Sequence, residues 1–287
     1  KRVGNNVVFF VLLTLSVLFL VPIIIVVINS FKSRIYISSQ PLKLPNAETF
    51  VALENYINGV TSSDFFSAFL RSLFITVVSV ILIVLFASMA AWYIVRSNSK
   101  ITKGIYYMLV FSMIVPFQMV MYTMTYVTNR ANLDNVFGIT FVYLGFGAGL
   151  SVFMFTGFMK SIPLEIEEAA MIDGCGKFRI LLQIVLPASK AVLATVGLFY
   201  GVTMWNQYEH PMMFIQNMNL FPLQMKIRTI VDGGGELQAV TMAQTANYTS
   251  ATLSAAAVVF AILPVLVAYP WIQKYFAKGA MLGSVKG

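Results

Sequence analysis

Six apolar runs dominate this sequence and constrain its fold more than any other feature. The hydrocarbon core of a bilayer is about 30 Å thick and an α-helix rises about 1.5 Å per residue, so a span needs about 20 apolar residues. The runs are Val7–Ile28, Phe66–Val95, Ile105–Val127, Phe137–Phe158, Ala191–Trp205 and Leu253–Ile272. Because these runs and their loops fill nearly the whole chain, we predict an all-α polytopic membrane protein with six transmembrane helices in one domain, residues 1–287.

Composition supports a membrane protein and argues against several classes of function. Only 10% of the residues are charged, whereas soluble domains carry about 25%, so the chain lacks the polar surface that water requires. The single cysteine, Cys175, excludes an intrachain disulfide. With His210 as the one histidine, the chain offers little material for a metal site or for the nucleophile–base pair of an intramembrane enzyme. We therefore expect no metal, no cofactor and no enzymatic activity.

The distribution of positive charge predicts how the spans are oriented, because cytoplasmic segments carry an excess of Lys and Arg. With both termini in the cytoplasm, the cytoplasmic segments hold 12 of the 19 basic residues and 4 of the 11 acidic residues. Topology thereby explains the net charge of +8, and nucleic-acid binding is not expected. This orientation places loops 29–64 and 206–249 outside the cell, and loop 159–190 and a tail at 275–287 inside it.

The cytoplasmic loop 159–190 carries the most informative pattern in the chain. Pro163 suits the first turn of a helix, where its missing N–H costs nothing, and the acidic residues that follow suit a helix N-terminus. Gly174 is a natural helix stop because it adopts positive φ without strain. A second amphipathic stretch, Lys177–Leu186, ends at Pro187. The pattern predicts a short helix–turn–helix beneath the membrane.

The first helix of this loop combines small and acidic side chains. Ala169 and Ala170 would let another surface approach the helix backbone closely, and Glu168 and Asp173 offer carboxylates to a basic partner. A helix of this kind, held in the cleft of a partner protein, would transmit rigid-body motion.

With these residues the sequence resembles the membrane subunits of binding-protein-dependent importers. Their cytoplasmic signature is Glu-Ala-Ala, three residues, Gly, nine residues, Ile, one residue and Leu-Pro. The matching residues here are Glu168-Ala169-Ala170, Gly174, Ile184 and Leu186-Pro187. Three further segments are similar to the carbohydrate branch of the family, in particular to its maltose-type second permease: Ser161-Ile162-Pro163, Trp205-Asn206 and Gly283–Gly287.

The resemblance implies a type I ABC importer fold and a permease function in a bacterial cell membrane. It implies a heteromer with a sister permease, two ATP-binding cassette subunits and an extracytoplasmic solute-binding protein. In the family the loop docks into a cleft of the ATP-binding subunit. The residues expected to dock here are Glu168, Ala169, Ala170, Asp173 and Gly174. The implied substrate is a carbohydrate, in particular an oligosaccharide, and a non-sugar solute such as a polyol or sugar phosphate stays open.

ATP is expected to bind to the partner subunits and not to this chain. A phosphate-binding loop needs Gly, four residues, then Gly-Lys and Ser or Thr. Gly176-Lys177 comes closest, but Met171 stands at the first Gly position and Phe178 at the last. An ion-coupled secondary transporter is the rival interpretation. Such transporters place acidic residues inside their spans, and none of the six predicted spans has Asp or Glu in its interior.

A path for a sugar needs hydrogen-bonding groups and aromatic faces that stack on sugar rings. Gln118, Tyr122 and Tyr126 recur every fourth residue after Pro116, which is expected to kink the third span, so these three share one helix face. Further candidates are Tyr143, Tyr200, Trp205 and Asn206. The alternative for these residues is a place in the aromatic belt at the membrane–water interface.

Two other groups of residues near the spans have simpler expectations. Gly145, Gly147 and Gly149 in the fourth span would permit close helix packing. Glu209 and His210 follow the fifth span and are expected to be solvated at the interface, with the lining of a cavity as the alternative.

The external loop 206–249 contains a glycine-rich tip. Its residues are Asp232, Gly233, Gly234, Gly235 and Glu236. Three consecutive glycines leave no side chains to clash with a narrow cleft. In the maltose-type family the equivalent loop probes the docked binding protein, which implies a contact with that protein here. A plain flexible turn is the alternative.

Overall fold

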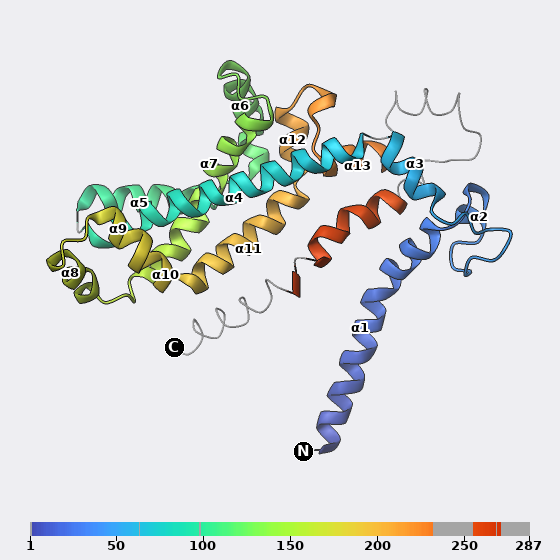
Figure 1. Cartoon of the computed structure of the whole chain (residues 1–287), viewed down its shortest axis with the longest axis horizontal. Helices are drawn as coiled ribbons and strands as arrows, with labels where there is room; N and C mark the ends of the chain where they lie inside the picture. Colours follow the sequence, from blue (N-terminus) through green and yellow to red (C-terminus); the bar gives the residue numbers. More distant parts are fainter. Residues whose placement is uncertain (1, 63, 98, 232–254, 268, 271–287) are drawn as a thin grey trace. The chain divides into compact units, whose positions relative to one another are not determined.

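The computed structural model describes residues 2–62, 64–97, 99–231, 255–267 and 269–270. In these ranges the regular elements are helices, apart from an isolated antiparallel bridge between Lys32 and Phe50. The chain divides into two compact units, residues 1–68 with 225–265 and residues 69–224 with 266–287. We call them the first and the second unit; Figure 1 colours the helices of both in chain order.

Three helices are long and apolar enough to cross a membrane by themselves: α1 (Arg2–Ser30), whose span is Asn6–Ser30, α4 (Phe65–Arg96) and α7 (Val136–Met159). Two pairs of helices meet the same criterion together but are bent. These are α5 (Lys100–Ser112) with α6 (Phe117–Arg130), at 107°, and Lys177–Ala188 with α11 (Lys190–Asn206), at 82°. By length and composition, the described residues therefore contain three candidate spans, or five if each bent pair is one span, and a shorter apolar helix at Ala255–Val267.

The first five predicted spans fall on these helices, with one difference. The sixth, Leu253–Ile272, contains the shorter helix Ala255–Val267 and extends at both ends beyond the described residues. The first, second and fourth runs each form one unbroken helix, and the fifth lies within α11. The third run, expected as one kinked helix, is instead two helices that meet at 107°. Pro116 lies at the break, immediately before α6. Proline lacks the N–H of a helical hydrogen bond and its ring clashes with the preceding turn, so the chain turns sharply where a kink was expected.

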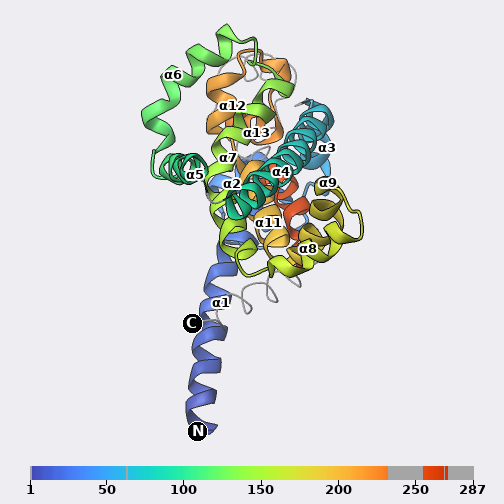
Figure 2. The ribbon, with the colours of Figure 1, turned by 90° about the vertical axis from the view of Figure 1, so that its left-hand side faces the viewer.

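In the second unit, α7 packs against both α5 and α11 (Figures 1 and 2). Two glycines allow this close packing. A Cβ added at Gly149 would lie 2.5 Å from the backbone oxygen of Leu109 in α5, and one added at Gly147 would lie 2.5 Å from Cδ1 of Ile83 in α4. The expected role of glycine in helix packing is confirmed at these two positions.

Beyond α11 the chain returns to α4. It passes through three short helices, α12 (Glu209–Phe214), a 3-10 turn (Met218–Leu220) and α13 (Leu223–Val231). Arg71 of α4 donates from Nε to the backbone oxygen of Phe221 at 3.1 Å. Ser72 Oγ accepts from the backbone N–H of Leu223 at 2.7 Å. These bonds fasten the start of α13 to the first part of α4.

In the first unit, α1 is apolar on all sides, and the 18-residue apolar window of its span has no buried residue. Asn29 and Ser30, at its end, are buried. The segment after it, expected as a plain loop, contains two helices, α2 (Arg34–Ser39) and α3 (Glu54–Ser62). The side chain of Lys32 is buried there. Its Nζ donates to Asn29 Oδ1 at 2.9 Å and to the backbone oxygen of Gln40 at 2.8 Å. Hydrogen bonds from a buried ammonium group thus hold this segment against the end of α1.

Candidate functional site

The loop between α7 and α11 folds as a helix–turn–helix, as predicted. Its elements are α8 (Leu164–Ile172), α9 (Lys177–Ile180), a π-helical stretch (Leu181–Val185) and α10 (Leu186–Ala188). Figures 1 and 2 both show α8 and α9 side by side at one end of the second unit. The signature residues of the sequence therefore lie on a compact substructure and not on an extended loop.

Gly174 forms the turn between the two helices. Its φ of +80° lies in the left-handed region, which glycine adopts without the steric cost of a Cβ. The N–H of Gly174 donates to the oxygen of Met171 at 3.0 Å, and the N–H of Cys175 donates to the oxygen of Ala170 at 2.9 Å. Together these bonds form a Schellman cap on α8. The prediction that Gly174 ends this helix is confirmed.

The helix α8 has one face turned into the protein and one turned outward. Glu167 and Ala170 are buried and, three residues apart, share a side of the helix. Glu168, Ala169 and Asp173 are exposed. The sequence placed both alanines in the expected docking set, and the structure turns only Ala169 outward. The exposed carboxylates thus share one side of the helix with the small Ala169.

Apolar side chains are also exposed on this helix–turn–helix. Ile172, at the end of α8, is 87% exposed, and Phe178, at the start of α9, is 70% exposed. The others of this group are Leu164, Ile166, Met171 and Leu182. A cluster of exposed apolar side chains with polar residues around it is typical of an interaction surface. We call Glu168, Ala169, Ile172, Asp173 and Phe178 the outward face of the loop.

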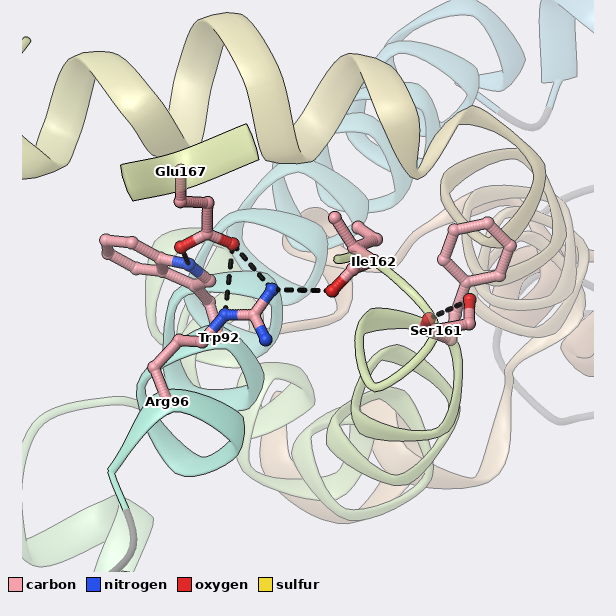
Figure 3. A network of polar contacts seen from close by, with 6 residues as sticks. Trp92, Arg96, Ser161, Ile162 and Glu167 are labelled. Atoms are coloured by element: carbon pink, nitrogen blue, oxygen red, sulfur yellow. Dashed lines mark hydrogen bonds and ion pairs between the residues drawn. The ribbon is translucent and has the colours of Figure 1, made fainter. Parts of the chain in front are cut away.

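A polar network fixes the inward face of α8 to α4 (Figure 3). Glu167 Oε1 accepts from Arg96 Nη2 at 2.7 Å and from Arg96 Nε at 3.0 Å. Glu167 Oε2 accepts from the indole Nε1 of Trp92 at 3.0 Å. Arg96 Nη2 also donates to the backbone oxygen of Ile162, just before α8, at 3.0 Å. The network joins the loop to the last turns of a span.

Burial makes this network energetically significant. The side chain of Glu167 is 3% exposed and that of Arg96 is 21% exposed. Removing a carboxylate from water is costly unless a counter-charge and hydrogen-bond donors compensate it, and here three N–H groups do so. Sequence reasoning counted Glu167 only as one of several acidic residues near a helix start. The i, i+4 spacing of Trp92 and Arg96, which puts both donors on one side of a helix end, could have indicated an acidic partner.

The candidate pathway residues fall into two groups in the structure. Tyr122 and Tyr126 of α6 are exposed, at 76% and 62%, and Gln118 is exposed on the same helix. The guanidinium of Arg130 lies 5.5 Å from the ring centre of Tyr126. The remaining candidates lie on α7 and α11: Tyr143, Tyr200 and Trp205 are buried, and Asn206 is exposed. The structure therefore does not bring the predicted set together at one place.

His210 lies in an aromatic cluster. Its ring centre is 4.1 Å from that of Phe117, at the start of α6, and 4.8 Å from that of Phe146, in α7. Gln207 Nε2 lies 2.9 Å from His210 Nδ1. Desolvation by burial lowers the pKa of His210 to about 4, so the ring is neutral at physiological pH. The expectation that His210 is solvated at the interface was wrong, because it packs between helices.

Two expectations concern parts that the structure leaves open. The glycine-rich tip, Asp232–Glu236, and the tail 275–287 lie outside the described residues.

Among the described residues, no group of three or more His, Cys, Asp or Glu side chains is placed to hold a metal ion.

Comparison with known proteins shows a family match and relatives along nearly the whole chain. Residues 83–281 match the profile of the family described as "Binding-protein-dependent transport system inner membrane component". The chain is 31% identical over 275 residues to the probable starch degradation products transport system permease protein AmyC of Thermoanaerobacterium thermosulfurigenes, covering 96% of this chain and 94% of that protein. It is 30% identical over 290 residues to the polygalacturonan/rhamnogalacturonan transport system permease protein YtcP of Bacillus subtilis, covering 100% and 99%.

Two solved structures of transporters have a similar fold. The fold matches a chain in the crystal structure of a bacterial ABC transporter involved in the import of the acidic polysaccharide alginate. The TM-score is 0.81 at 25% identity, over 96% of this chain and 97% of that chain. A second match has a TM-score of 0.60 at 12% identity and shows the fold alone. It comes from a bacterial alginate ABC transporter in complex with an alginate pentasaccharide-bound periplasmic protein.

Proposed function

This chain belongs to the family of inner membrane components of binding-protein-dependent transport systems, and we propose that it forms half of the translocation pathway of an ATP-driven oligosaccharide importer. It is a transport permease and not an enzyme. The other half of the pathway would come from a sister permease, the energy from two ATP-binding subunits, and the substrate from an external binding protein.

The observation that carries the proposal is the outward face of the loop between α7 and α11. Glu168, Ala169 and Asp173 are exposed there beside the apolar side chains of Ile172 and Phe178. The carboxylates suit a basic partner, the small Ala169 permits close approach, and burial of the apolar side chains would favour association. These features support docking of this face into a cleft of an ATP-binding subunit on the cytoplasmic side.

A carbohydrate is the substrate class that the comparisons favour. Two relatives with 30–31% identity over nearly their full length carry starch degradation products or polygalacturonan in their names. The exposed face of α6 with Gln118, Tyr122 and Tyr126 suits such a substrate, because amide groups bond to sugar hydroxyls and tyrosine rings stack on sugar rings. We assign this face, and not the buried Tyr143 and Tyr200, to the sugar pathway.

Two further roles complete the proposal. Asp232–Glu236, which follow α13 in the sequence, would contact the external binding protein, because three glycines permit close approach to a cleft. Both chain ends would lie in the cytoplasm, since that orientation puts most Lys and Arg residues inside.

Docking can be tested by co-purification of the assembly through a tag on this chain. Glu168→Arg reverses a charge in the outward face. It is expected to lower the recovered ATP-binding subunit by about half, since the sister permease would retain its own copy. Buried or interfacial charge reversals commonly cost several kcal/mol. The matched control is Glu48→Arg, which makes the same charge change at an exposed residue between α1 and α3. Undiminished recovery with Glu168→Arg would contradict docking through this face.

A further inference from the structure

Two adjacent glutamates of α8 point in different directions. Successive helix residues are rotated by about 100°, so Glu167 and Glu168 cannot share a face. Glu168 is exposed, whereas the side chain of Glu167 is 3% exposed and accepts hydrogen bonds from Arg96 and Trp92. The family signature marks the outward residue. The inward residue needs its own explanation.

We propose that Glu167, Arg96 and Trp92 form a clamp that makes α8 move as one body with α4, and that Glu167 is thereby a positioning residue for coupling. The proposal rests on the docking of the outward face described above. It adds the connection by which a movement of the docked helix α8 would reach the membrane-spanning helix α4.

The contacts connect α4 both to α8 and to the segment just before α8. Arg96 contacts Glu167 within α8 and also the backbone oxygen of Ile162 before it, so it fixes both the helix and its entry. Trp92 holds the second carboxylate oxygen from one turn earlier in α4. Figure 3 shows all of these bonds converging on the end of α4. Three donors on one carboxylate resist rotation of α8 better than one contact would.

The clamp joins two elements that are far apart along the chain. The path along the backbone from α8 leads directly to α7 through residues 160–163. The α4 span ends at Arg96, 71 residues before Glu167. Without the clamp, a displacement of α8 would reach α4 only through side-chain packing. With it, the displacement passes through a charged, largely desolvated pair, which is stronger than a neutral hydrogen bond.

Glu167→Gln is the sharpest single change. A glutamine keeps the shape but offers one acceptor oxygen and an NH2 group, so one of the two donors, Arg96 or Trp92, must face another donor. It also removes the negative charge and leaves Arg96 without this counter-charge. The double variant Arg96→Gln/Glu167→Gln leaves no unpaired buried charge, and it therefore reports loss of the clamp even if the single variant assembles poorly.

The test uses the complete assembly in proteoliposomes with its purified binding protein. Tyr126→Cys on the exposed face of α6, in a Cys175→Ala background, reports pathway opening through its rate of labelling by a membrane-impermeant maleimide. The rate is compared without nucleotide and with ATP plus vanadate. Co-purification of the ATP-binding subunit is measured in parallel, because it reports docking alone. Glu48→Gln, which removes an exposed carboxylate outside α8, is the matched control.

We expect the nucleotide-dependent change in labelling to shrink roughly tenfold in Glu167→Gln, within the range of coupling between distant sites, while co-purification stays at the wild-type level. The nucleotide-dependent change in labelling should shrink as much in Arg96→Gln. It should shrink no further in the double variant than in either single variant, since the effects of residues in one network are not additive. A wild-type labelling response in both Glu167→Gln and the double variant would overturn the clamp. Failure of the wild-type chain to co-purify with an ATP-binding subunit would instead overturn docking.

Discussion

At the scale of single residues, His210 shows how burial replaces solvation at the end of a span. The side chain is 6% exposed and stacks on Phe146 at 4.8 Å. Its burial lowers the pKa to about 4, against the ordinary 6.5. Between pH 6.5 and pH 4 the unfolded chain binds a proton at His210 and the folded chain does not. The folded state therefore loses stability as the pH falls from 6.5 toward 4.

The expected loss is about 2–3 kcal/mol between pH 7 and pH 4.5, from about 1.4 kcal/mol per pKa unit. The measurement is the melting temperature of the purified chain in detergent across this range. In His210→Phe the corresponding part of the pH dependence should be absent, because phenylalanine does not titrate. Equal pH dependence in both proteins would show that the folded state accepts the proton at His210.

The glutamates of α8 show which site residues a sequence can predict. Gly174 was predicted correctly as a helix stop because the cap closes within a few residues. The docking role of Glu168, assigned from a fixed motif spacing, stays a prediction. Glu167 was missed because its role depends on Arg96, 71 residues earlier. That pairing follows from tertiary packing, which local periodicity does not encode.

At the scale of elements, the contact of α5 with α7 depends on a missing side chain. A Cβ at Gly149 would lie 2.5 Å from the backbone oxygen of Leu109, which cannot rotate away. Gly149→Ala is therefore expected to destabilise the chain by roughly 1–3 kcal/mol through overpacking. In the same helix, Gly145 has nothing within 4 Å of an added Cβ, so Gly145→Ala is the matched control.

Thermal unfolding of the two variants in detergent checks this packing. Gly149→Ala should melt below the wild type, and Gly145→Ala should match the wild type or exceed it, because alanine favours helix. Equal melting temperatures for the two variants would show that α5 moves aside to accommodate the methyl group.

Elements were predictable where one apolar run makes one helix. α4 and α7 follow from length and hydropathy alone. The 107° break between α5 and α6 was foreseen only as a kink, since Pro116 marks the position of a break but not its angle. The helices after α1 were missed because they are short and are held by the buried Lys32. Lysine is among the residues least expected to be buried.

At the scale of the whole molecule, the hydropathy and the loop signature were sufficient for the class of protein. Both depend on composition and spacing along the chain, and the family match over residues 83–281 agrees with them. The arrangement of helices around a substrate path was harder to predict from the sequence. Aromatic residues occur on many faces of many spans, and only their exposure separates Tyr122 on α6 from Tyr143 within α7.

The most direct test of coupled import is ATP-dependent uptake of labelled oligosaccharides into proteoliposomes. We expect the complete assembly to accumulate at least one oligosaccharide from a panel of α- and β-linked chains, and only with ATP on the side of the ATP-binding subunits. Glu168→Arg should abolish this uptake, and this chain reconstituted alone should give no flux. Sustained flux through the lone chain, or uptake that Glu168→Arg leaves unchanged, would contradict coupling through α8.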